Sequence, residues 1–195
     1  MVLRDEESPF FKIVRHPGVR YERGNTPHIP HNSLFSLVKE MLAAGLGEFC
    51  ESEKDICTLI KQSFQKVKDR WPDEWNRKPS ETKLMHGAGL RGIAFLIEQK
   101  LSQILTANED IEDIADPRLW DGVGQMLDTL KERVIWSTVA MTGANDEVQS
   151  WFTENVLNRQ NTPTDIGKLK DALQARLLIN PTGRRRRRGS RRAQS

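Results

Sequence analysis

Apolar residues recur at helical spacing through most of this chain. In the clearest series, between Ser52 and Pro72, they follow one another at steps of four, four, three and four: Ile56, Ile60, Phe64, Val67 and Trp71. This spacing places the side chains on one face of an α-helix. Ser52, with Asp55 three residues later, resembles a capping box and indicates the helix start, and Pro72 indicates its end.

The same periodicity predicts five further helices. The first begins at Asn32 or Ser33, either of which can cap it, and ends at Gly45 and Gly47. A long segment begins after Pro79 and Ser80 and reaches Leu105. Its second half is apolar on a broad face, and the glycines of its first half predict a break or a close helix contact there. The remaining three helices are expected to start at Asp116-Pro117, at Asp146, and at Thr162 or Thr164.

Residues 1–31 carry no such pattern. Prolines and glycines interrupt them at Pro17, Gly18, Gly24, Pro27 and Pro30, so no long helix fits. We expect a short strand or extended arm over residues 10–14, whose apolar side chains pack on the helices. The pattern predicts a mainly α protein: about six helices in one globular domain over residues 32–180, an extended N-terminal arm over residues 1–31, and a disordered Arg-rich tail over residues 181–195.

The distribution of charge adds what the periodicity does not show. The chain has 195 residues, of which 37% are hydrophobic and 29% charged, enough for one packed domain. Its net charge is +3, and subtracting the seven positive charges of one short segment leaves −4 for the rest. The seven arginines of that segment are Arg184, Arg185, Arg186, Arg187, Arg188, Arg191 and Arg192. The basic pI of about 8.9 therefore comes from the tail alone.

This arginine tail predicts contact with nucleic acid. Seven like charges within nine residues repel one another and cannot fold alone. The guanidinium group suits phosphate, and neutralising phosphates releases counterions, which gives salt-dependent affinity for DNA or RNA without sequence preference. No aromatic residue interleaves the arginines to stack on bases. The alternatives are a localisation signal, contact with an anionic membrane, or a solvated tail without a defined partner.

Other features point to the cytoplasm and away from an enzyme. The N-terminal residues contain no apolar run typical of a signal peptide, and no stretch approaches the roughly 18 apolar residues of a membrane span. Cys50 and Cys57 are interpreted as free thiols in a reducing compartment. The sequence has no nucleophile elbow, Walker loop, zinc-protease helix or cysteine–histidine signature. We therefore expect no catalytic residues and no cofactor.

One short motif carries a hypothesis of its own. Gly87, Gly89 and Gly92 form G-x-G-x-x-G, with His86 and Arg91 beside them. In a dinucleotide site such glycines follow a buried strand and bring the backbone to a pyrophosphate at a helix start. The residues before the motif indicate helix or turn rather than strand. We favour close helix packing over a phosphate-contacting loop.

Two groups of residues have the chemistry of metal ligands. His28 and His31, together with Cys50 and Cys57, have the ligand types of a zinc site, but six residues between the cysteines is the wrong spacing for a metal knuckle. The acidic run over residues 109–113 is interpreted as a solvated cluster beside a helix. We expect no metal, and we assign the five tryptophans to core packing.

Several short segments resemble a known family. Residues 63–75 read Ser-Phe-Gln-Lys-Val-Lys-Asp-Arg-Trp-Pro-Asp-Glu-Trp, and residues 84–92 read Leu-Met-His-Gly-Ala-Gly-Leu-Arg-Gly. Both resemble the second half of the DGQHR-domain proteins, a group similar to the DNA phosphorothioation regulator DndB. Residues 8–13, 134–136 and 161–166 extend the resemblance over about residues 8–178. It implies a helical half-protein in the DNA-modification or phage-defence systems of prokaryotes.

The chain also departs from that family. The Asp-Gly-Gln-His-Arg motif is absent, since the nearest segment reads Asp121-Gly122-Val123-Gly124-Gln125. The ParB-like half that precedes these segments in the family is missing as well. The nucleotide chemistry and DNA reading of that half are therefore not carried over.

Together these patterns predict a non-enzymatic helical module that binds nucleic acid through its arginine tail, accessory to DNA modification or phage defence. Its body would contact a protein partner or a second copy, without a membrane. The alternative is a self-assembling, nucleocapsid-like protein that packages nucleic acid with its C-terminal tail. A third hypothesis is an enzyme with a phosphate site at residues 86–92.

Overall fold

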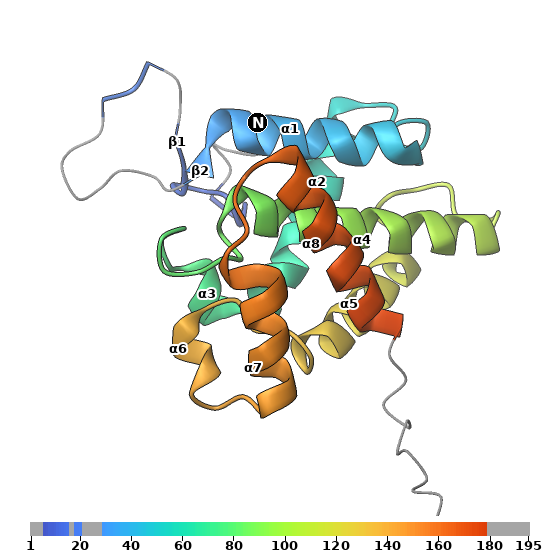
Figure 1. The fold of residues 1–195 in the computed structure, drawn as a ribbon. Helices are drawn as coiled ribbons and strands as arrows, with labels where there is room; N and C mark the ends of the chain where they lie inside the picture. The colour runs from blue at the N-terminus through green and yellow to red at the C-terminus, as the bar shows by residue number, and fades with distance from the viewer. Residues whose placement is uncertain (1–5, 16–17, 21–28, 179–195) are drawn as a thin grey trace, which may run out of the picture.

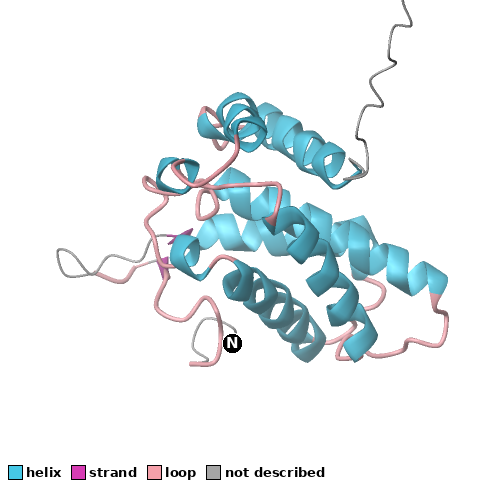
Figure 2. Cartoon of the chain, turned by 90° about the horizontal axis from the view of Figure 1, so that it is seen from below, coloured by secondary structure: helices cyan, strands magenta, loops and turns pink. Residues whose placement is uncertain are grey.

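The computed structural model describes residues 6–15, 18–20 and 29–178, and most of this part is helical (Figures 1 and 2). The strands are β1 (Val14–Arg15) and β2 (Ile29–Pro30). The α-helices are α1 (His31–Met41), α2 (Glu53–Arg70), α3 (Pro72–Trp75), α4 (Gly87–Ala107), α5 (Pro117–Lys131), α6 (Thr138–Met141), α7 (Asp146–Phe152) and α8 (Pro163–Leu178). Wider π-type turns, Leu42–Leu46 and Thr153–Leu157, extend α1 and α7. The predicted mainly α fold is confirmed.

Helix α2 begins and ends where the sequence predicts. The Asp55 amide donates to Ser52 Oγ at 3.2 Å, and the Ser52 amide donates back to the Asp55 carboxylate at 2.9 Å, which completes a capping box. Pro72 follows the last turn and begins α3. Phe64 and Val67 are fully buried, so the apolar face of this helix forms one wall of the core.

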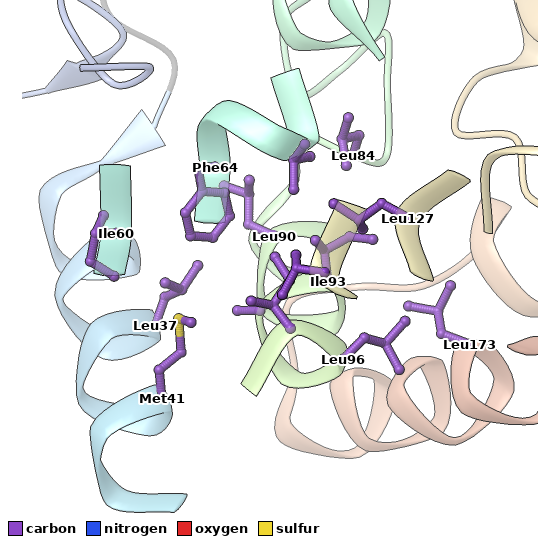
Figure 3. Packing of buried hydrophobic residues seen from close by; sticks show 14 of the residues in the cluster. Leu37, Met41, Ile60, Phe64, Leu84, Leu90, Ile93, Leu96, Leu127 and Leu173 are labelled. Atoms are coloured by element: carbon purple, nitrogen blue, oxygen red, sulfur yellow. The ribbon is translucent and has the colours of Figure 1, made fainter. Parts of the chain in front are cut away.

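Helix α4 lies at the centre of the fold and packs against α1, α5 and α8, while α2 packs against α5 (Figure 3). Ten of its 21 residues are buried, and they point in almost every direction around its axis. A helix that is apolar nearly all round is stable only when neighbours cover it on several sides. The outer helices accordingly turn their own apolar faces, such as Leu37 of α1, Leu127 of α5 and Leu173 of α8, towards it.

The residues before α1 contribute to the same core. Strands β1 and β2 pair in parallel, with Val14 opposite Ile29. Phe10 is completely buried, with its ring centroid 4.9 Å from that of Phe64 and 5.5 Å from that of Trp75. The Trp75 indole N–H donates to the Pro9 carbonyl oxygen at 3.1 Å, which fixes this contact in one geometry. The expected packing of the N-terminal apolar residues on the helices is therefore confirmed for Phe10.

The predicted cap of α1 is wrong. The helix begins at His31, and its N-cap position is Pro30, which makes no side-chain cap hydrogen bond. Pro30 is the last residue of β2 and has extended backbone angles, so the strand pair sets the helix start before Asn32 and Ser33 are reached. The Asp116 and Thr162 caps are confirmed, because these side chains accept from the Arg118 and Asp165 amides at 2.8 and 3.2 Å.

Eight α-helices are present in the described part of the chain where the periodicity predicts six. The additional two, α3 and α6, are single turns of four residues, too short to show a period. Residues 134–136 are non-helical, and the Trp136 carbonyl oxygen accepts from the Lys83 amide at 2.7 Å. Four of the five tryptophans are buried, and the fifth, Trp151, is partly covered, in agreement with the core-packing interpretation.

The described helices include none that combines the length and the apolar composition needed to cross a membrane.

Replacing Phe64 with alanine is expected to destabilise the protein by about 3–5 kcal/mol, because it removes a fully buried ring and leaves a cavity beside Phe10 and Trp75. The measurement is chemical denaturation followed by circular dichroism. Phe35→Ala is the matched control: this phenylalanine of α1 is 65% exposed, so its loss should change the unfolding free energy little. Equal effects of the two substitutions would contradict the assignment of Phe64 to the core.

Candidate functional site

The glycine-rich motif lies at the start of α4. His86 occupies the N-cap position with extended backbone angles, and the helix begins at Gly87. The residues just before it, from Lys78 to Met85, form turns and bends. The Trp136 carbonyl oxygen accepts hydrogen bonds from the Lys83 amide and from the Thr82 hydroxyl of this segment. The described part of the chain has its strands only at Val14–Arg15 and Ile29–Pro30, so no described strand leads into the motif.

The glycines are explained by close packing. A Cβ atom at Gly89 would lie 1.9 Å from the carbonyl oxygen of Lys83, where the chain folds back over the first turn of α4. A Cβ atom at Gly92 would lie 2.9 Å from a methyl group of Leu173, where α8 crosses α4. Only a residue without a side chain allows both approaches, so the close contact that the sequence analysis favoured is confirmed.

The space in front of the helix start is taken by the protein itself. A Cβ atom at Gly87 would lie 2.6 Å from the side-chain oxygen of Asn161, which belongs to the loop before α8. The His86 ring is partly buried, and its Nδ1 has no hydrogen-bond partner among the described residues. Burial, with the nearby charge of Lys83, lowers the pKa of His86, so its neutral form is favoured. A neutral histidine lacks the positive charge that would attract a phosphate group.

Arg91, the charged residue of the motif, belongs to an ion-pair cluster with Glu40 and Lys170. Glu40 of α1 accepts from the Arg91 guanidinium group and from Lys170 of α8, the latter at 3.2 Å. Burial raises the pKa of Glu40, but the hydrogen bonds from Arg91 and Lys170 outweigh it and hold that pKa below its ordinary value. Glu40 therefore stays ionised near neutral pH, and the cluster joins three helices. Sequence reasoning singled out Arg91 but missed Glu40 and Lys170, which lie 51 and 79 residues away from it.

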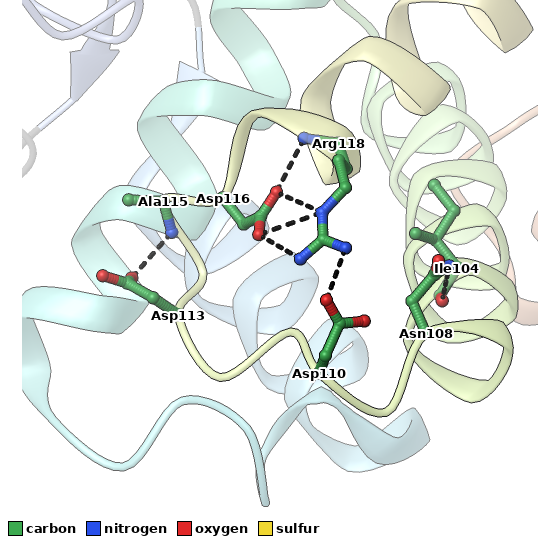
Figure 4. Close-up of polar contacts among 7 residues, drawn as sticks. All are labelled: Ile104, Asn108, Asp110, Asp113, Ala115, Asp116 and Arg118. Atoms are coloured by element: carbon green, nitrogen blue, oxygen red, sulfur yellow. Dashed lines mark hydrogen bonds and ion pairs between the residues drawn. The ribbon is translucent and has the colours of Figure 1, made fainter.

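The acidic run before α5 is organised by an arginine. Arg118 donates to Asp110 and to Asp116, each at 2.8 Å, and Asp113 accepts from the backbone amide of Ala115 at 2.8 Å (Figure 4). The hydrogen bonds from Arg118 lower the pKa of both Asp110 and Asp116. These carboxylates fix the loop between α4 and α5.

The suggested zinc ligands are only partly described. His28 lies outside the described residues, His31 is the first residue of α1, Cys50 is buried and Cys57 is partly buried on α2. The described residues contain no group of three or more His, Cys, Asp or Glu side chains placed to hold a metal ion. Burial, with a smaller contribution from Asp55, raises the pKa of the Cys50 thiol to about 11.

The seven tail arginines, Arg184 to Arg188 with Arg191 and Arg192, lie outside the described residues, beyond the last described residue of α8, Leu178.

Comparison with known proteins assigns no family to this chain: no family model, no curated protein and no solved structure matches it. The resemblance to the DGQHR-domain proteins stays a prediction from the sequence.

If close packing explains Gly89, then Gly89→Ala should destabilise the protein by about 1–3 kcal/mol or more, because the new methyl group meets backbone that cannot move aside easily. Gly167→Ala is the control within α8: no atom lies within 4 Å of its Cβ position, so we expect a gain of about 0.5–1 kcal/mol from the better helix former. Thermal unfolding of both variants checks this. A neutral Gly89→Ala would disprove the packing explanation.

The raised pKa of Cys50 predicts an inert thiol. At pH 8, a pKa of about 11 leaves about one thiol in a thousand as the reactive thiolate. A disulfide reagent should therefore modify Cys57 in a Cys50→Ser variant much faster than Cys50 in a Cys57→Ser variant, as followed by absorbance. Comparable rates in the two folded variants would contradict the burial of Cys50.

Proposed function

We propose that this protein is a non-enzymatic helical module that binds nucleic acid through its arginine tail. The observation that carries the proposal is the density of positive charge, seven arginines within residues 184–192. Such a segment attracts a polyanion by neutralising its phosphates and releasing their counterions, which requires no folded binding surface. The proposal therefore concerns DNA and RNA alike.

The pairing of charges in the body supports this division of roles. Three arginines of the described body are engaged by carboxylates: Arg70 with Asp128 at 3.0 Å, Arg118 with Asp110 and Asp116, and Arg176 with Glu147. Paired charges contribute little to a positive surface potential, and the chain outside the tail arginines carries a formal charge of −4. These features support the assignment of phosphate binding to the tail.

The body supplies the other half of the proposed module. Its helical surface would contact a protein partner or a second copy, while the tail brings the nucleic acid. The resemblance of residues 63–75 and 84–92 to the DGQHR-domain proteins adds a setting, namely DNA modification or phage defence.

The test is binding of fluorescent duplex and single-stranded oligonucleotides at several salt concentrations. For the natural chain, the slope of log affinity against log salt should reach about −6, since seven arginines each contribute about −0.9 on a duplex. A variant with all seven arginines replaced by glutamine should lose the affinity and the salt dependence together. A variant with seven lysines is the matched control and should keep most of both, because it keeps the charge.

Two outcomes would overturn the proposal: a slope near zero for the natural chain, or unchanged binding by the glutamine variant. Light scattering on the same samples separates the module from the packaging alternative. A small complex fits the module, whereas large uniform particles that contain the nucleic acid would mean that the protein is a nucleocapsid-like one.

A further inference from the structure

A cavity of about 380 Å³ lies between α1, α4 and α8, within the range typical of small-molecule sites. One part of its wall is apolar, formed by Met41, Ala94 and the ring of Phe95. Most of the remaining residues are charged, and they include the ion-pair cluster of Glu40, Arg91 and Lys170. This combination of an apolar surface with a few convergent charged groups is characteristic of binding sites rather than of packing gaps.

The charged wall contains one hydrogen-bond donor that has no acceptor among the described residues. The Nη2 group of Arg91 contacts Glu40, whereas Nε on the same edge of the guanidinium group is buried without a hydrogen-bond partner among the described residues. A buried donor left unpaired is costly, and an acceptor from a ligand would satisfy it. The Lys170 ammonium lies 3.2 Å from Glu40 Oε2 and 5.2 Å from the centre of the Phe95 ring, at the border between the charged and apolar walls.

Two carboxyl groups, those of Glu40 and Glu98, also line the wall. Glu98 is 5% exposed, and its Oε1 accepts from the Ser102 hydroxyl at 3.0 Å. Burial raises the pKa of Glu98, which moves this group towards its neutral form. Glu40 is the one wall carboxylate whose pKa is lowered, and it faces two cations, Arg91 and Lys170, so this part of the wall already holds one carboxylate.

We propose that this cavity binds a small organic carboxylate, whose carboxylate group takes the Nε–Nη2 edge of Arg91 and whose apolar part lies against Phe95, Met41 and Ala94. Glu40 then stays on Lys170. The position that Glu40 occupies shows that a carboxylate fits between these cations. A phosphate group, with its greater charge and size, would meet the carboxyl groups of Glu40 and Glu98. The site is independent of the arginine tail.

The test is calorimetric titration of the full-length protein with benzoate and hexanoate, which combine a carboxylate with an apolar body. Saturable binding is expected with a dissociation constant of about 1 mM or below, as suits ligands with so few atoms. Benzylammonium, which has the shape of benzoate but the opposite charge, should not bind, and inorganic phosphate should bind at least about tenfold more weakly. The glutamine-tail variant should bind benzoate as the natural chain does, which excludes the tail as the site.

Two substitutions in the cluster should act in opposite directions. Arg91→Gln removes the main ligand contact and should weaken benzoate binding by about tenfold or more. Glu40→Gln removes the internal competitor and should tighten it. Arg118→Gln, which breaks a surface cluster elsewhere, is the matched control and should leave binding unchanged. Melting curves establish that each variant is folded.

The proposal is overturned if neither carboxylate binds saturably, if benzylammonium or phosphate binds as well as benzoate, or if Glu40→Gln and Arg91→Gln weaken binding alike in folded protein. The last result would mean that the cluster serves only to hold the three helices together. Because the nucleic-acid assay depends on the tail and this assay does not, failure of one proposal leaves the other standing.

Discussion

Burial of α4 on nearly all sides is the constraint on which the rest of the fold depends. Its apolar residues leave no broad face for water, so α1, α5 and α8 must all pack against it, and α2 completes the core around Phe64. The glycines at its start serve the same end, since Gly89 admits the backbone of Lys83 and Gly92 admits Leu173. The sequence of this motif resembles a nucleotide-binding loop, but in this structure its glycines allow α4 to pack closely against its neighbours.

How far the sequence could predict this structure depended on whether a signal was local. The apolar period of α2, the Ser52–Asp55 capping box and the Asp116-Pro117 start all lie within a few residues, and all three are confirmed. The start of α1 is set by pairing with β1, about fifteen residues earlier in the chain, which no local pattern reveals. The short helices α3 and α6 are positioned by tertiary contacts, such as the hydrogen bond from Ser137 to Glu74, rather than by periodicity.

The same distinction applies to the candidate sites. The arginine tail is visible in the sequence because its residues are contiguous. The cluster of Glu40, Arg91 and Lys170 is not, since its members come from three helices and each is an ordinary charged residue in its own segment. Glu98 gives no local sign of its burial either, because it ends the apolar run over residues 93–97 and is followed by Gln99 and Lys100.

The order in which the chain leaves the ribosome gives the buried position of Phe10 a further consequence. Its partners Phe64 and Trp75 are synthesised more than fifty residues later, so this apolar segment emerges with nothing to cover it. Helix α4 likewise waits for Leu173 of α8, close to the end of the described chain. The core of this fold is therefore completed only after α8 has been synthesised, and until then these apolar surfaces lack their partners.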